Sequence, residues 1–116
     1  MHDERRKELR FPVNQSGELR LVSGKALRVK VTDISASGVG MICDEGVARG
    51  AGADLHLLLL VPVQRWFIAS LSVCSVTLIG FQGYRLGASF AGLAPDMQEA
   101  LLAYIKTRGR PVLTQS

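Results

Sequence analysis

Apolar and polar residues alternate along much of this chain with a period of two, the pattern of a β-strand with one buried face. The clearest case is the stretch from Ala26 to Ile34, where Leu27, Val29 and Val31 alternate with Arg28, Lys30 and Thr32. Such alternation is typical of antiparallel sheets that face solvent on one side. The stretch therefore predicts a strand that delivers Asp33 near its end.

Similar patterns, separated by turn residues, predict five more strands and an all-β fold with a C-terminal helix. Six short strands in a meander-like order favour a small antiparallel β-barrel, because closure removes exposed strand edges. The expected strands are 17–22, 26–34, 39–43, 54–61, 66–78 and 84–91.

The period changes near the C-terminus, and residues 95–108 are predicted to form a helix. Apolar side chains recur there at helical spacing, at Met97, Ala100, Leu101, Tyr104 and Ile105. Proline suits the first turn, and basic residues follow in the last one. We expect this helix to plug or flank the barrel, with a frayed tail after it.

Length and charge narrow the class of protein. The 116 residues are enough for one domain with its own core, and the formal net charge of +4 favours an anionic partner. This excess is too small and too dispersed for a typical DNA-binding tail. A small anionic ligand is the better expectation, with no DNA partner.

Cysteine use and hydropathy predict a cytoplasmic protein without a membrane span. Cys43 and Cys74 lie in apolar runs, so we interpret both as reduced core residues. The start of the chain lacks the apolar region of a signal peptide. The longest charge-free stretch, residues 66–81, is shorter than the roughly 20 residues that a membrane helix needs.

We find no pattern that predicts catalysis or a metal site. There is no nucleophile with a base and an orienting group, and no phosphate-binding glycine loop. His2 and His56 lack partners at ligand spacing. Trp66 is expected to contribute partly buried packing and not a stacking platform.

Two polar stretches carry the candidate chemistry. The first, residues 5–10, reads Arg-Arg-Lys-Glu-Leu-Arg, and its guanidiniums suit phosphate oxygens or the O6/N7 edge of guanine. The second, residues 33–38, reads Asp-Ile-Ser-Ala-Ser-Gly and offers a carboxylate, a hydroxyl and a glycine that could supply positive φ. Alone, the first could be a solvated tail and the second an ordinary Asx turn with a bulge glycine.

Together, in this order and spacing, the two stretches resemble the signature of the PilZ domain, a bacterial receptor module for cyclic di-GMP. That signature is RxxxR, often with a preceding Arg, followed some twenty to thirty residues later by [D/N]xSxxG. Arg6 to Arg10 with Arg5 in front matches the first part, and Asp33 to Gly38 matches the second. The weaker trailing pattern of the family, on the last strand, is matched by residues 87–90, Gly-Ala-Ser-Phe.

The resemblance implies a six-stranded, PilZ-like split barrel and a ligand site for cyclic di-GMP, with no cofactor and no enzymatic activity. The implied ligand-binding residues are Arg5, Arg6, Arg10, Asp33, Ser35 and Gly38. Arginines would cover phosphates and guanine edges, while Asp33 and Ser35 take guanine donors or phosphate contacts. An Arg directly before RxxxR is compatible with a stacked pair of ligands.

The implied organisation is a flexible arm at 1–13 carrying RRxxxR, a barrel with its helix at 14–110 and a tail at 111–116. So polar an arm cannot offset the entropy of its own ordering, and we expect it to order on ligand binding. The expected partner is a protein of the motility, pilus or exopolysaccharide machinery involved in biofilm formation, and the expected state is a monomer or a ligand-linked dimer. A ligand-independent PilZ-like adaptor and an RNA-binding barrel are the alternatives.

Overall fold

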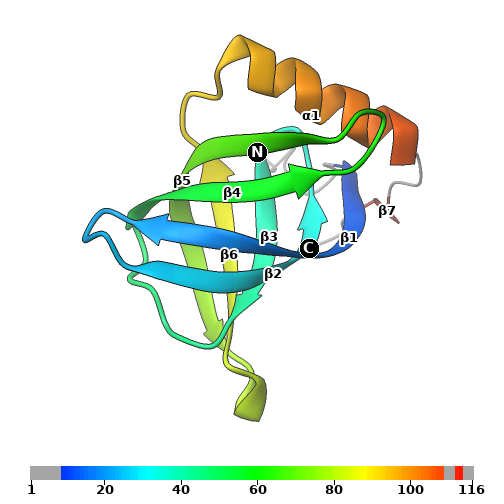
Figure 1. Cartoon of the computed structure of the whole chain (residues 1–116). Helices are drawn as coiled ribbons and strands as arrows, with labels where there is room; N and C mark the ends of the chain where they lie inside the picture. Colours follow the sequence, from blue (N-terminus) through cyan, green and yellow to red (C-terminus); the bar gives the residue numbers. More distant parts are fainter. Residues whose placement is uncertain (1–8, 109–111, 114–116) are drawn as a thin grey trace, which may run out of the picture.

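The computed structural model describes residues 9–108 and 112–113, and six strands of this part close into an antiparallel barrel (Figure 1). A C-terminal helix and a short seventh strand complete the described elements. Their bounds are β1 Leu9–Leu21, β2 Ala26–Ile34, β3 Gly38–Cys43, β4 Gly52–Leu59, β5 Arg65–Leu78, β6 Tyr84–Phe90, α1 Pro95–Arg108 and β7 Val112–Leu113, with a 3-10 turn at Gly80–Gln82.

The barrel consists of two three-stranded meanders joined along both edges. β1, β2 and β3 form one meander and β4, β5 and β6 form the other, with β1 paired to β4 and β3 paired to β6. The predicted barrel is confirmed, whereas a single meander order is wrong at the step from β3 to β4. The loop over residues 44–51 carries the chain between these two strands, which are not neighbours.

Most predicted elements appear within a few residues of their expected bounds, but the first strand is much longer. It begins at Leu9 instead of Gly17, so residues 9–13, which we assigned to the arm, lie in β1. A register shift between Pro12 and Gln15 interrupts the alternation there and hides the strand from pattern reading. Residues 1–8 lie outside the described part of the chain.

The tail also differs from the expectation. Val112–Leu113 forms β7, which pairs antiparallel with Leu9 and Arg10 of β1. Two residues carry too little pattern to predict a strand. Their pairing depends on where α1 delivers the chain.

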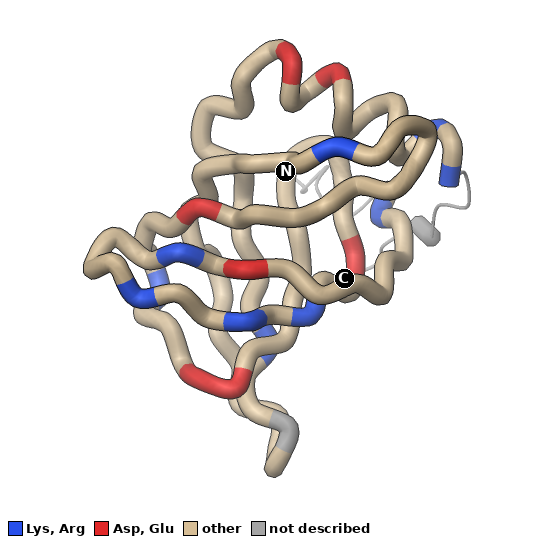
Figure 2. Tube along the Cα trace, in the orientation of Figure 1, with Lys and Arg blue, Asp and Glu red and all other residues tan. Residues whose placement is uncertain are grey.

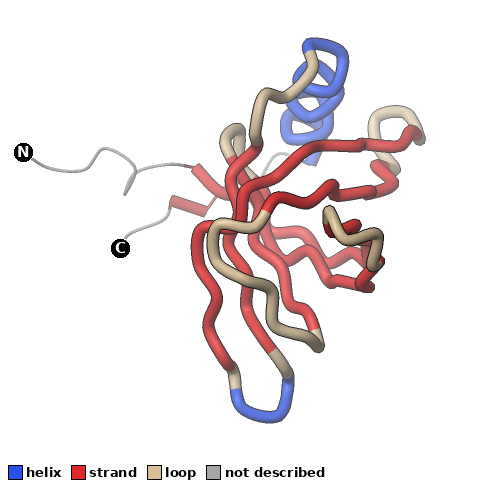
Figure 3. The backbone as a smooth tube through the Cα atoms, turned by 90° about the vertical axis from the view of Figure 1, so that its left-hand side faces the viewer, coloured by secondary structure: helices blue, strands red, loops and turns tan. Residues whose placement is uncertain are grey.

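The barrel interior is filled by the inward residues of each strand, and α1 covers one end (Figure 3). The alternation in β2 is confirmed, since Leu27, Val29 and Val31 are buried while Arg28 and Lys30 are exposed. On the helix the most deeply buried side chains are Ala100, Leu101 and Tyr104. Burying a side chain such as leucine contributes about 1.5–3 kcal/mol, which holds the helix to the barrel.

Two expectations of burial are wrong, both on β5. Cys43 is buried as expected, but Cys74 is exposed, and Trp66 is 58% exposed. Side chains alternate along a strand, so the neighbours Phe67 and Val73, which are buried, direct these two outward. An apolar run therefore does not by itself place a residue in the core.

Within the described part of the chain, no helix combines the length and the apolar character needed to cross a membrane.

Candidate functional site

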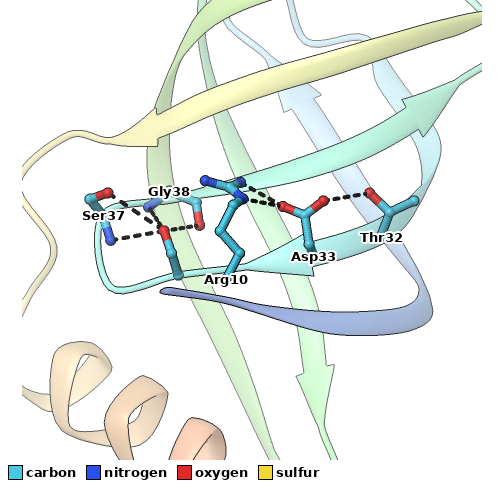
Figure 4. Close-up of polar contacts among 6 residues, drawn as sticks. Arg10, Thr32, Asp33, Ser37 and Gly38 are labelled. Atoms are coloured by element: carbon cyan, nitrogen blue, oxygen red, sulfur yellow. Dashed lines mark hydrogen bonds and ion pairs between the residues drawn. The ribbon is translucent and has the colours of Figure 1, made fainter. Parts of the chain in front are cut away.

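The carboxylate of Asp33 is held between Arg10 and Thr32 where β1 pairs with the end of β2 (Figure 4). Arg10 Nε and Nη2 both donate to Oδ1, at 2.8 and 2.5 Å, and Thr32 Oγ1 donates to Oδ2 at 3.1 Å. Each side chain of the ion pair is 27% exposed. Charge-assisted hydrogen bonds of this kind are stronger than those of a fully exposed pair. The structure thus brings the last arginine of RxxxR and the first residue of DxSxxG into direct contact.

Ser35 organises the turn between β2 and β3 from the inside. Its side chain is fully buried, and its Oγ accepts hydrogen bonds from the backbone N–H of Gly38 at 3.1 Å and of Ser37 at 3.3 Å. The Ser35 N–H in turn donates to the Gly38 carbonyl at 2.9 Å. In this conformation the hydroxyl faces the turn and not solvent, which favours a positioning role over the direct ligand contact that we expected.

Gly38 is required by close packing and not by its backbone angles. It is absent from the described glycines with positive φ, so the expected left-handed conformation is wrong. A Cβ at this position would lie 2.3 Å from the carbonyl oxygen of Ala88 on β6. Only glycine lets the turn approach β6 this closely.

Two further glycines lie in the sheet beside Asp33, and sequence analysis missed them. The register places Asp33, Gly40, Gly87 and Ser75 in one row across β2, β3, β6 and β5. Both glycines face outward, because the residues on either side of each are buried in the core: Val39 and Met41, and Leu86 and Ala88. We call Gly40 and Gly87, with their backbone, the glycine platform.

The platform has no room for larger side chains. A Cβ on Gly40 would lie 2.7 Å from Asp33 Oδ2, and one on Gly87 would lie 2.6 Å from Ser75 Oγ. The signal in the sequence was the spacing of Gly38 and Gly40, since residues two apart on a strand share a face. The absence of side chains at Gly40 and Gly87 thus makes room for the Asp33 carboxylate and the Ser75 hydroxyl.

A second cation flanks the platform. Arg85 is exposed on β6, two residues before Gly87 and therefore on the same face. Arg10 lies at the opposite side, beside Asp33. Guanidiniums on both sides of a carboxylate suit a ligand that combines phosphates with hydrogen-bonding rings.

Four of the six predicted site residues are described, and they gather at this edge of the barrel. Arg10 and Asp33 are in contact, and Ser35 and Gly38 build the adjoining turn. Arg5 and Arg6 lie outside the described residues. In the described ranges, 9–108 and 112–113, no group of His, Cys, Asp and Glu could hold a metal ion.

The family description of the PilZ domain matches residues 4–107. The chain belongs to the PilZ family. The match spans both motif stretches, the barrel and α1. A comparison with curated proteins found no match.

Solved structures share this PilZ fold at low sequence identity. The inhibitor of motility MotI/DgrA of Bacillus subtilis superposes with a TM-score of 0.75 at 19% identity, covering 93% of this chain and 53% of that one. The PilZ domain of Escherichia coli YcgR, solved with c-di-GMP, gives 0.71 at 16% identity, covering 90% and 91%. The Klebsiella (K. pneumonia) MrkH–c-di-GMP complex gives 0.64 at 20% identity, covering 90% and 54%. The chain thus spans about half the length of MotI and MrkH.

Proposed function

We propose that this PilZ domain is a receptor for cyclic di-GMP. The observation that carries the proposal is the Arg10–Asp33 pair at the edge of the glycine platform, which joins the two signature motifs in one place. The presence of c-di-GMP in the YcgR and MrkH structures, which share the fold, supports this choice of ligand.

The proposed binding mode follows from the chemistry of the ligand, which has two guanines and two phosphates. A guanine ring lies against the outer surface beside Asp33, whose carboxylate occupies the space that a side chain at Gly40 would take. Arg10 donates to a phosphate or to the O6/N7 edge of guanine. A carboxylate offers about four lone-pair sites, so Asp33 can accept from guanine N–H groups while it holds Arg10.

The remaining predicted residues have distinct proposed roles. Ser35 and Gly38 fix the turn that positions Asp33, through the hydroxyl hydrogen bonds and the close approach to β6. Arg5 and Arg6 add phosphate contacts when the residues before β1 order over the ligand, and they allow for a stacked pair of ligands. This ordering changes the surface that a partner protein of the motility, pilus or exopolysaccharide machinery recognises.

Titration calorimetry with cyclic di-GMP tests the proposal. We expect the wild-type protein to bind at micromolar ligand and Arg10→Ala to bind about 10- to 100-fold more weakly, because one charge-assisted contact is worth about 1.5–3 kcal/mol. Arg65→Ala is the matched control, since Arg65 is exposed at the start of β5, ten residues from Ser75. Wild-type affinity in Arg10→Ala would remove this residue from the site. No heat with the wild-type protein would refute the proposal and leave the ligand-independent adaptor and the RNA-binding barrel as the alternatives.

A further inference from the structure

A groove of about 750 Å³ runs over the barrel face formed by β2, β1, β4 and β5, the front face in Figure 1. It is lined on one side by Arg28 of β2 and on the other by Leu58, Trp66 and Ile68 of β4 and β5. The glycine platform lies on β3 and β6, behind this face. Although Arg10 and Asp33 lie on β1 and β2, no described residue of the proposed ligand site lines the groove, so the two are separate.

One wall of the groove is apolar and exposed. Trp66 is 58% and Ile68 is 47% exposed, although each is next to a buried residue of β5. The alternation of β5 directs both side chains away from the core, so barrel packing does not account for them. Adjacent large apolar side chains on a concave surface are typical of interaction sites.

The opposite wall is cationic. Arg28 lines the groove, and Lys30, just outside it, points outward from the same face of β2. Neither forms an ion pair with a carboxylate among the described residues. Glu18, between the two walls, is already paired with Arg20 at 2.8 Å. Figure 2 shows the blue of Lys and Arg along β2, whereas β4 and β5 are mostly tan on this face. The wall formed by β2 thus carries positive charge without a paired carboxylate, and the wall formed by β4 and β5 does not.

The dimensions of the groove favour a helix. One row of paired residues crosses it, from Arg28 to Glu18, His56 and Ile68. Four strands about 4.8 Å apart span roughly 14 Å, and an α-helix with side chains is about 10–12 Å wide. A hollowed face fits a rod better than it fits a flat membrane surface.

We propose that this groove binds an amphipathic helix of a partner protein, with an apolar stripe against Trp66 and Ile68 and carboxylates along the flank that faces Arg28 and Lys30. The occupant is defined by charge complementarity, since a basic helix would meet Arg28 and Lys30 with like charges. This inference does not depend on the proposed ligand.

Trp66 makes the test direct, because it is the only tryptophan in the chain. The probe is a synthetic amphipathic peptide of about four turns with a leucine stripe and a glutamate flank. Its matched control carries lysine in place of each glutamate. We expect the acidic peptide to shift Trp66 emission to shorter wavelength and to saturate, and the basic peptide to bind at least about tenfold more weakly.

Variants of the protein locate the binding site. Arg28→Glu should weaken binding of the acidic peptide about tenfold, whereas Lys106→Glu, an exposed charge reversal on α1, should not. Trp66→Ala, followed by anisotropy of a labelled peptide, should weaken it as well.

Three outcomes would overturn the proposal. The first is equal or absent binding of the two peptides, and the second is an Arg28→Glu protein that binds like wild type. The third is a Trp66 emission that does not respond to the peptide but shifts with anionic phosphatidylglycerol vesicles or when the protein concentration alone is raised. Because cyclic di-GMP calorimetry reports on the other face, failure here would leave the proposed function untouched.

Discussion

Replacing Gly40 by alanine should disable ligand binding and leave the fold intact. The new Cβ would lie 2.7 Å from Asp33 Oδ2 and 2.9 Å from Oδ1, well inside the 3.4 Å of ordinary van der Waals contact. The obstructing atoms belong to the end of a side chain and not to backbone, so the carboxylate moves and the strand does not. Its movement disrupts the 2.5 and 2.8 Å bonds from Arg10.

Gly40→Ala should change the unfolding free energy less than it changes the affinity for the ligand. Weakening a partly exposed ion pair costs about 1 kcal/mol of unfolding free energy, and the lower chain entropy of alanine in the unfolded state offsets about 0.4–1 kcal/mol of that. The melting temperature should therefore change by only about 4 °C or less. Losing the charge-assisted contact to ligand costs about 1.5–3 kcal/mol, so affinity should fall about 10- to 100-fold.

Calorimetry with cyclic di-GMP and thermal melting on the same samples measure both quantities. Gly52→Ala is the matched control, because a Cβ there meets nothing nearer than the Leu71 carbonyl oxygen at 3.9 Å. The control should bind like wild type. If Gly40→Ala bound with wild-type affinity, or if Gly52→Ala lost as much, the role assigned to the platform would be refuted.

Three other predictions concern single side chains. Asp33→Ala should lower ligand affinity at least about tenfold in calorimetry, whereas Asp33→Asn, which keeps the shape and an acceptor oxygen, should lose less; equal losses would show that shape is irrelevant. Gly38→Ala should lower the unfolding free energy by about 2 kcal/mol or more, measured from the midpoint of urea denaturation. The reason is that its Cβ would lie 2.3 Å from the carbonyl oxygen of Ala88, a backbone atom that cannot move aside. An unchanged midpoint would contradict this. Tyr104→Phe should raise the unfolding free energy by about 1 kcal/mol, because the buried hydroxyl has no hydrogen-bond partner among the described residues. Burial raises the pKa of Tyr104 above its unfolded value near 10, although the charge of Arg108 opposes the shift. The contribution of this group to the unfolding free energy should therefore be complete below pH 10 and be lost as pH rises through the folded pKa. A pH series of denaturation curves should show this loss in the wild-type protein and not in Tyr104→Phe.

Local patterns were sufficient for most of the elements and for bringing the two polar stretches to attention. Alternation identified the inward face of β2, and helical spacing identified the buried face of α1, because both depend only on neighbouring residues. The DxSxxG stretch was correctly assigned to the connection between two strands. In the structure its serine caps the turn and its glycine packs against β6, and a motif does not distinguish such roles from ligand contact.

Pairing between distant strands could not be predicted in this way. A period of two says which face of a strand is buried but not which strand lies beside it. The pairing of β3 with β6 sets Gly87 next to Gly40 and creates the platform, and the pairing of β1 with β4 creates the groove beside Trp66. Exposure of Trp66 likewise depended on its neighbour Phe67 taking the inward position.

The sequence by itself thus determined the class of fold and the helix, since these follow from local spacing and residue chemistry. Tertiary structure alone decided which strands pair to close the barrel, the surface beside Asp33 and the groove over β2, β1, β4 and β5. The physical reason is that these features form between segments far apart in the chain, where the energy of pairing depends on the packing of the whole barrel and not on any local pattern.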